Sequence, residues 1–345
     1  MSTLKKSMTI AALLLILSGG FSCYYGGSQL GGYASLAGSI LSVPSEDAGT
    51  IPDSTIARTI AVDVTPRPLS IAETMPDLDS LEVRSFENLM QLADARRVYL
   101  MPIDSIVQWV GERFVGSTYV GGMLDAADEE QLVVSFRKFD CVLFVETVLA
   151  LSEGVASRDY SGSGFVRRLE TLRYRGGEMN GYASRLHYFS DWLHDNQIRG
   201  NVRDVTEELG GVGRSKTLNI MSKHRRLYRR LATDDSLHQE IVEMEARLAT
   251  IPQYYIPQDL MRPALDLIKP GDIVSTATIA RGLDVSHSGF AYRNADGSIG
   301  LLHASSANGE VMVTPSLRDY VVGNRLVEGI VVARPIRPTR IAAAN

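Results

Sequence analysis

The sequence predicts a mixed α+β fold, and two features of its pattern lead to this prediction. Periodic apolar residues typical of helices occupy much of the chain from about residue 85 to residue 250. Short segments with strand composition follow from residue 273 onward. Helices that precede a set of antiparallel strands are typical of α+β domains. The 345 residues, of which 45% are hydrophobic and 22% charged, are sufficient for a substantial core.

The charge of the chain gives no indication of a nucleic-acid partner, because the net charge is −5. Residues 223–230 form a basic run with one tyrosine. The next predicted helix carries Glu240, Glu243 and Glu245, so a solvated or ion-paired helix face explains this run. We therefore expect no nucleic-acid binding, and we also expect a monomer.

The N-terminus resembles a bacterial export signal, which we place at residues 1–23. Lys5 and Lys6 precede an apolar run at residues 8–17, which is too short to span a bilayer. Small residues then lead to Cys23, which resembles the lipidated cysteine of a lipoprotein, although Gly20 stands where leucine is usual. A plain cleaved signal and a retained anchor are the alternatives. We expect a protein of the bacterial cell envelope, lipid-anchored at a membrane surface or periplasmic.

Residues 24–84 are rich in Gly, Ser, Ala and Pro, and we expect a tether followed by an irregular segment. A poorly ordered extension without a tethering role is the alternative. The main domain is predicted at residues 85–340, with a helical insertion at about 160–265. Helices are predicted over residues 85–96, 102–114, 217–231 and 236–250.

The most informative predicted helix starts at Cys141. Asp140 is a good N-cap residue, and apolar residues after Cys141 recur at helical spacing until Gly154, a plausible stop. The unpaired N–H groups of a first helical turn favour a thiolate by roughly one pKa unit, and Asp140 opposes part of this effect. A useful nucleophile therefore needs a second cationic partner, normally a histidine.

Two interpretations of Cys141 remain open at this point. Free cysteines are commonly small buried core residues. The chain has two cysteines, however, and if Cys23 is lipidated or removed, Cys141 has no partner within the chain. An unpaired thiol is a liability in an exported protein unless it is buried or used in catalysis.

Two of the six histidines lie on adjacent predicted strands, 285–292 and 299–305. Residues 294–297 between them have strong turn composition. Pairing Tyr292 with Ser298 across a loop at 293–297 places His287 directly opposite His303, close enough for one imidazole to orient the other. The alternative is a pair of polar residues at a sheet edge, and a one-residue slip would separate them. Strands are also predicted at 273–276 and 326–334.

Metal and cofactor chemistry have no support in the sequence. Neither a Cys-x-x-Cys nor a His-Glu-x-x-His spacing occurs, and there is no glycine-rich phosphate loop. We therefore expect neither a metal site nor an organic cofactor.

Five short motifs in a fixed order resemble the NlpC-type cysteine peptidase and amidase superfamily, which cuts bacterial cell-wall peptides on a papain-like fold. They are Gly116-Ser117-Thr118-Tyr119, Asp140-Cys141, Gly271-Asp272-Ile273, His287-Ser288-Gly289 and His303-Ala304-Ser305. The stretches 139–151, 184–192 and 282–289 are similar to the NlpC-like N-acetylmuramoyl-L-alanine amidases in particular. The resemblance covers roughly residues 85–335.

The resemblance implies a fold and a set of roles. The nucleophile helix would pack on an antiparallel sheet, with Cys141 as the nucleophile, His287 as the general base and His303 as the orienting residue. Muropeptides would be the substrate, cleaved between N-acetylmuramic acid and L-alanine. Substrate contacts are then expected from Tyr119, Asp140, Arg185, His187, Tyr188, Trp192 and Ser286, although the aromatic residues of this set at helical spacing fit a core equally well.

The sequence departs from the superfamily pattern at two places. Thr118 replaces proline before Tyr119, and Val142 and Leu143 replace the small hydroxyl residues that usually follow the cysteine. Cleavage within the stem peptide and a catalytically silent muropeptide-binding lipoprotein are therefore the two alternatives to the amidase.

Overall fold

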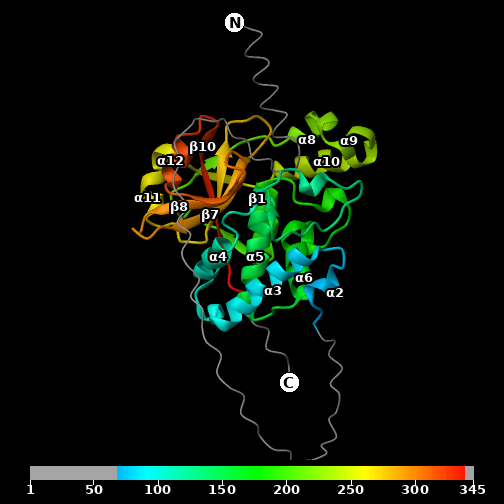
Figure 1. Ribbon diagram of the computed structural model, residues 1–345. Coiled ribbons are helices and arrows are strands. Elements are labelled where there is room, and N and C mark those ends of the chain that lie inside the picture. The colour runs from blue at the N-terminus through cyan, green and yellow to red at the C-terminus, as the bar shows by residue number, and fades with distance from the viewer. Residues whose placement is uncertain (1–67, 339–345) are drawn as a thin grey trace, which may run out of the picture. The chain divides into compact units, whose positions relative to one another are not determined.

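The computed structural model describes residues 68–338, and these residues form a mixed α+β fold (Figure 1). The α+β prediction is thereby confirmed. The predicted signal at 1–23 with Cys23, and the predicted tether up to residue 67, lie outside the described residues. Between residues 68 and 338, no helix combines the length and apolar character needed to cross a membrane.

The fold begins earlier than residue 85. Helix α2 spans Ile71–Thr74 and α3 spans Ser80–Ala95, and both start at side-chain caps. Ser70 and Glu73 form a reciprocal capping box, and the Asp79 carboxylate accepts the N–H groups of Leu81 and Glu82. The predicted start at 85 was wrong because it used apolar periodicity and missed these polar caps. A short 3₁₀ turn, η1 (Val98–Leu100), leads to α4 (Ile103–Glu112).

Helix α5 (Cys141–Ser157) is the central helix, and it starts at the predicted residue. The predicted end at Gly154 was wrong, because the helix continues to Ser157 and is followed by the C-cap Arg158, which adopts a left-handed conformation with φ of 59°. Gly154 has a packing role instead. A Cβ there would lie 2.5 Å from Nη2 of Arg168, a guanidinium that donates to the Ala150 carbonyl of α5.

Residues 160–265 differ from the predicted helical insertion because they also supply three strands to the sheet. The strands are β3 (Val202–Asp204), β4 (Val212–Arg214) and β5 (Gln253–Pro257). The helix predicted at 217–231 is broken into α8, η5 and α9. The α-helices of this segment are α6 (Gly162–Arg173), α7 (Phe189–Ile198), α8 (Ile220–Lys223), α9 (Arg229–Thr233), α10 (Asp235–Leu248) and α11 (Met261–Leu265). The 3₁₀ turns are η3 (Arg175–Gly177), η4 (Tyr182–Ser184), η5 (Arg225–Leu227) and η6 (Gln258–Leu260).

One sheet collects the strands of the described chain in the order β2-β1-β9-β8-β7-β6-β10-β5-β4, with β3 also paired to β10. The remaining strands are β1 (Thr118–Tyr119), β2 (Lys138–Phe139), β6 (Ile273–Thr278), β7 (Val285–Arg293), β8 (Ile299–Ser305), β9 (Glu310–Thr314) and β10 (Val327–Pro335). Two elements near the sheet, β9 and helix α12 (Leu317–Val322), were not predicted.

The sheet must curl to bring its β2 end close to β7. Four strand spacings separate these strands, which is about 19 Å in a flat sheet. The Phe144 ring nevertheless lies 5.8 Å from the Phe139 ring of β2 and 5.8 Å from the Phe290 ring of β7. The first turn of α5 therefore spans the concave side of a curled sheet, and it carries Cys141 there.

Two apolar clusters occupy the two faces of the sheet. Helices α3 to α7 pack on one face, where Phe290 and Leu302 point. Helices α11 and α12 pack on the other face, where Ala291 and Leu301 point. A third cluster fills the space beneath α8, α9 and α10.

Candidate active site

Cys141 lies buried at the N-terminus of α5, directly after the cap Asp140. The Asp140 carboxylate accepts the N–H groups of Val142 at 3.0 Å and Leu143 at 2.9 Å. The cap is thus as predicted, but it reduces the number of backbone N–H donors that remain at the helix terminus. Two backbone donors of the first turn already serve Asp140, so they cannot also bind a developing oxyanion.

The expectation that Cys141 has no partner within the chain depends on Cys23, the second cysteine of the sequence, which lies outside the described residues. Because only a thiolate is nucleophilic, any chemistry at Cys141 requires the reduced form.

His287 and His303 form a directly coupled pair of imidazoles. His287 Nε2 lies 2.7 Å from His303 Nδ1, and His303 Nε2 lies 2.9 Å from the Thr314 hydroxyl of β9. The Tyr320 ring of α12 lies 5.9 Å and 5.1 Å from the two imidazole centroids. Both histidines are buried, at 5% and 1% exposure. The predicted contact between the imidazoles is therefore present.

The predicted strand register was wrong by two positions, because Tyr292 pairs with Gly300 and not with Ser298. Continuing the observed register places Gly289, and not His287, opposite His303. A Cβ on Gly289 would lie 2.8 Å from the His303 Cβ, so the glycine makes room for the second imidazole. The two histidines share a face as diagonal neighbours, which long side chains can bridge.

The strand register also places Cys141 and His287 at the same end of the sheet. Lys138 pairs with Thr118, Thr118 with Glu310, and Glu310 with Ser305. Ser305 and His287 come next to each other when the β7–β8 register is continued. Across the curl, Val142 and Ser288 line one small cavity, and these are the residues that directly follow Cys141 and His287. Both imidazoles also lie next to the Tyr320 ring of α12.

Tyr119 lies at the end of β1, next to Phe139 of β2. Its N–H donates to the Gly309 carbonyl at 2.8 Å. Burial raises the pKa of the Tyr119 phenol to about 12, the Asp140 carboxylate also raises it, and a hydrogen bond with Ser306 opposes both effects. The phenol is therefore neutral at physiological pH and can donate a hydrogen bond. Thr118, in place of proline, takes part in the β1 pairing without disrupting it.

The electrostatics of the site favour neutral groups. Burial lowers the pKa of His287 to about 3. Burial and then the neighbouring His287 hold the pKa of His303 well below its ordinary value. Burial raises the pKa of Asp140 to about 6, against the helix N–H groups that lower it. Two neutral imidazoles can form an ordered hydrogen-bond chain, in which each ring donates from one nitrogen and accepts at the other.

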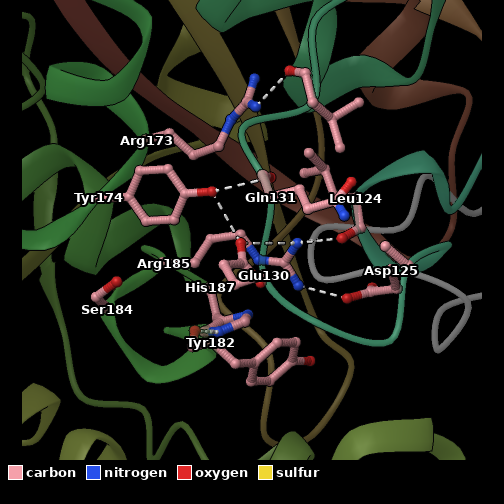
Figure 2. Close-up of polar contacts among 12 residues, drawn as sticks. Leu124, Asp125, Glu130, Gln131, Arg173, Tyr174, Tyr182, Ser184, Arg185 and His187 are labelled. Atoms are coloured by element: carbon pink, nitrogen blue, oxygen red, sulfur yellow. Dashed lines mark hydrogen bonds and ion pairs between the residues drawn. The ribbon is translucent and has the colours of Figure 1, made fainter. Parts of the chain in front are cut away.

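Arg185, a predicted substrate contact, is buried and paired with acidic and carbonyl groups of the protein (Figure 2). It donates to the Leu124 carbonyl at 2.6 Å and pairs with Asp125, and Glu130 lies 3.6 Å away. Arg230 also reaches Glu130, at 2.6 Å. These contacts fix the loop between β1 and β2, which connects Tyr119 to Cys141. Arg185 therefore holds the loop that connects Tyr119 to Cys141 in place.

His187, Tyr188, Trp192 and Ser286, which were also predicted to contact substrate, are buried in the structure. His187 Nε2 contacts the Tyr182 carbonyl at 2.8 Å, and burial followed by Arg185 lowers the pKa of His187 to about 3. The Tyr188 hydroxyl donates to Glu245 at 2.6 Å, and the Trp192 ring stacks on Phe189. Ser286, buried beside His287, exchanges a hydrogen bond with Thr276 at 3.1 Å. Tyr188 and Trp192 are thus buried among protein partners.

Three residues of the site were missed by the sequence interpretation: Ser306, Thr314 and Tyr320. All three follow the second histidine within a segment whose β9 strand and α12 helix were not predicted. The short apolar run Val311-Met312-Val313, rich in β-branched residues, was the available signal. Among residues 68–338, no cluster of three or more His, Cys, Asp or Glu side chains could hold a metal ion.

The fold belongs to a known class of proteins. Residues 109–330 match the AmiA-like family, described as N-acetylmuramoyl-L-alanine amidase-like. This match covers more than half of the chain, so the chain belongs to the AmiA-like family. No protein with a curated description matches it.

Solved structures agree with the family. An N-acetylmuramoyl-L-alanine amidase from Bacteroides uniformis shares 32% identity with a TM-score of 0.64, over 68% of this chain and 99% of that one. A Bacteroides fragilis protein that carries the provisional name of a xylanase shares 35% identity with a TM-score of 0.61, over 66% and 99%. A Legionella pneumophila protein at 22% identity and a TM-score of 0.56, over 73% and 95%, is similar in fold alone.

Proposed function

We propose that this protein hydrolyses the amide bond between N-acetylmuramic acid and L-alanine in peptidoglycan or its soluble muropeptides, with Cys141 as nucleophile. The membership in an amidase-like family supports the reaction class. The observation that supports the mechanism is the coupled imidazole pair at the same end of the sheet as the cysteine. We further propose the NlpC-type, papain-like relationship, on the strength of the motif order.

In the proposed reaction, the thiol of reduced Cys141 gives its proton to His287. The thiolate sulfur then attacks the lactyl carbonyl carbon, and a tetrahedral oxyanion forms. The His287 imidazolium returns the proton to the L-alanine nitrogen as the carbon–nitrogen bond breaks. A water molecule, deprotonated by His287, hydrolyses the resulting thioester and restores the thiol.

The Tyr119 hydroxyl is the donor that we assign to the oxyanion. Val142 and Leu143 donate to Asp140, which leaves the first turn of α5 with fewer donors than the sequence suggested. Tyr119 remains protonated and lies beside Asp140 at the entry of the helix. A neutral phenol in a partly buried place is a suitable hydrogen-bond donor to a developing negative charge.

Two alternatives follow from the same residues. Cleavage inside the stem peptide would use the same nucleophile with a differently shaped pocket. A silent muropeptide-binding lipoprotein would keep the fold without reactive chemistry at Cys141. Glycoside hydrolysis generally requires two carboxyl groups that flank the scissile bond, and the groups assembled here are a cysteine and two imidazoles. Outside the described residues, we propose lipidation of Cys23 and attachment to a membrane of the cell envelope.

The test is product identification by mass spectrometry after incubating the reduced chain with defined muropeptides, with and without the sugar. The proposal predicts an intact stem peptide with a free L-alanine amine, and no reaction of the sugar-free peptide. Fragments cut inside the stem would establish the endopeptidase alternative. Bound but unaltered substrate would establish the silent binder.

The matched control lies on the same helix. Cys141→Ala is expected to abolish release of the stem peptide. Thr147→Val removes a buried hydroxyl that has no hydrogen-bond partner among the described residues, at nearly constant volume, so it should retain activity. Equal loss in both variants would mean that α5 is sensitive to any substitution, and the Cys141→Ser variant then decides whether sulfur is required.

A further inference from the structure

We infer that Thr314 is a positioning residue that sets the tautomers of both histidines. The effect on catalysis rests on the proposed function, whereas the effect on the tautomers rests on the geometry alone. The hydroxyl of Thr314 lies 2.9 Å from His303 Nε2, and His303 Nδ1 lies 2.7 Å from His287 Nε2. The three side chains therefore form one hydrogen-bond chain across β9, β8 and β7.

The hydrogen bonds that link His287, His303 and Thr314 can donate in two directions, and only one direction lets His287 accept the thiol proton. His287 uses Nε2 toward His303, so Nδ1 is the nitrogen that must accept the thiol proton. Accepting at Nδ1 requires that Nε2 already carries a hydrogen and donates it to His303 Nδ1. His303 must then carry its own hydrogen on Nε2 and donate it to Thr314. The threonine hydroxyl thus has to act as an acceptor.

The opposite direction blocks the reaction. If His303 carried its hydrogen on Nδ1, it would donate to His287 Nε2, and His287 would hold its hydrogen on Nδ1. That nitrogen could not receive a proton from the thiol. The productive direction also suits the imidazolium intermediate, because His287 can then be protonated on both nitrogens without breaking its bond to His303.

The burial of His303 makes it dependent on the Thr314 hydroxyl as a hydrogen-bond partner. His303 is 1% exposed, so water cannot easily replace a lost partner at Nε2. A buried ring nitrogen without a partner is costly whether it carries a hydrogen or not. Removing the Thr314 hydroxyl therefore weakens the preference for one tautomer and loosens the orientation of both rings. Tyr320 limits their movement on the α12 side.

The experiment compares the full chain, reduced and in mild detergent, with its Thr314→Val and Thr314→Ser variants. Long-range ¹H–¹⁵N NMR spectra of ¹⁵N-histidine-labelled protein report which nitrogen of each ring carries the hydrogen. We expect hydrogens on Nε2 of both His287 and His303 in the wild type and in Thr314→Ser. We expect mixed tautomers in Thr314→Val, together with about a tenfold lower kcat and a nearly unchanged KM.

Thr206→Val provides a control for simple loss of stability. Thr206 accepts the Val332 N–H of β10 at 3.0 Å, and β6 separates β10 from the histidine strand β7, so its loss should lower Tm without changing tautomers or kcat. Unchanged tautomers in Thr314→Val, or hydrogens on Nδ1 in the wild type, would overturn the inference. If the tautomers respond as expected but no muropeptide is cleaved, the inference stands and the proposed function fails.

Discussion

Asp140 shows how one residue serves two structural purposes at this site. Its carboxylate caps α5 and so fixes where Cys141 begins the helix. The same carboxylate occupies two backbone donors and raises the pKa of Tyr119. The helix terminus is consequently less electropositive than a bare one. Activation of the thiol has to depend more on His287 than on the helix.

The low pKa of His287 leads to a prediction about pH. A base with a pKa lowered to about 3 stays neutral until the solution is strongly acidic. We therefore expect the acidic limb of kcat/KM on a muropeptide to have its midpoint below pH 6.5, the ordinary value for histidine. The alkaline limb should follow the thiol. An acidic midpoint at or above pH 6.5 would contradict the assigned pair.

Tyr119→Phe tests the assigned oxyanion donor. The variant keeps the ring and its packing but loses the hydroxyl, so we expect kcat to fall roughly 10- to 100-fold with little change in KM. Tyr292→Phe, at the far end of β7, is the matched control and should retain activity. A Tyr119→Phe enzyme with unchanged kcat would move the oxyanion donor to another group.

At the scale of the elements, the ionic network around Arg185 ties the β1–β2 loop to the inserted segment. Arg173 extends the network to α5, since its guanidinium donates to Glu146 at 2.6 Å and to the Val133 carbonyl at 2.6 Å. The loop therefore has buried anchors near both of its ends. This arrangement explains how a long irregular segment can hold Tyr119 and Cys141 in place.

Replacing Arg185 should be far more damaging than replacing a surface arginine. Arg185→Met leaves Asp125 and Glu130 without this cation in a buried environment, and we expect a loss of about 3–5 kcal/mol of unfolding free energy. Arg203→Met, which breaks an exposed pair with Glu208, should cost less than about 1 kcal/mol. Urea unfolding curves measure both. Similar values for the two variants would contradict a structural role for the network.

Glu153 on α5 predicts a pH dependence of stability. Burial raises its pKa to about 7, against Arg168 and Arg199, which lower it. The folded carboxyl holds its proton up to about pH 7, whereas the unfolded one ionises near 4.5, so a rise in pH through this window weakens the fold. Glu153→Gln should raise Tm by a few degrees at pH 8 and change it little at pH 5. An equal effect at both values would disagree with the raised pKa.

At the scale of the whole molecule, the helices and strands that the sequence predicted correctly are those whose own residues determine them. The start of α5 follows from Asp140 and the apolar face behind it, and β7 and β8 follow from their composition. The hairpin register could not be fixed this way. The chain closes its turn with the Asn294 N–H donating to the Ser298 carbonyl, so the ladder begins at Arg293 and Ile299.

The parts that were missed depend on partners distant in sequence. Strands β3 and β4 have three residues each and exist because β10 and β5 offer edges to them. Arg185 is of a residue type that often contacts ligands. Its partners, Leu124 and Asp125, lie about 60 residues earlier in the sequence, and it is buried against them. Local pattern therefore identified the candidate nucleophile and imidazoles, whereas it could not separate residues that touch substrate from residues that support the site.

The most direct test of the central claim is the detection of a covalent intermediate on Cys141. The reduced chain would be mixed with a muropeptide, quenched in acid within its first turnover, and digested for peptide mass mapping. We predict a thioester-linked N-acetylmuramyl group on the peptide that carries Cys141. Stem-peptide release by Cys141→Ala at the wild-type rate, with no modified peptide in the wild type, would contradict the account.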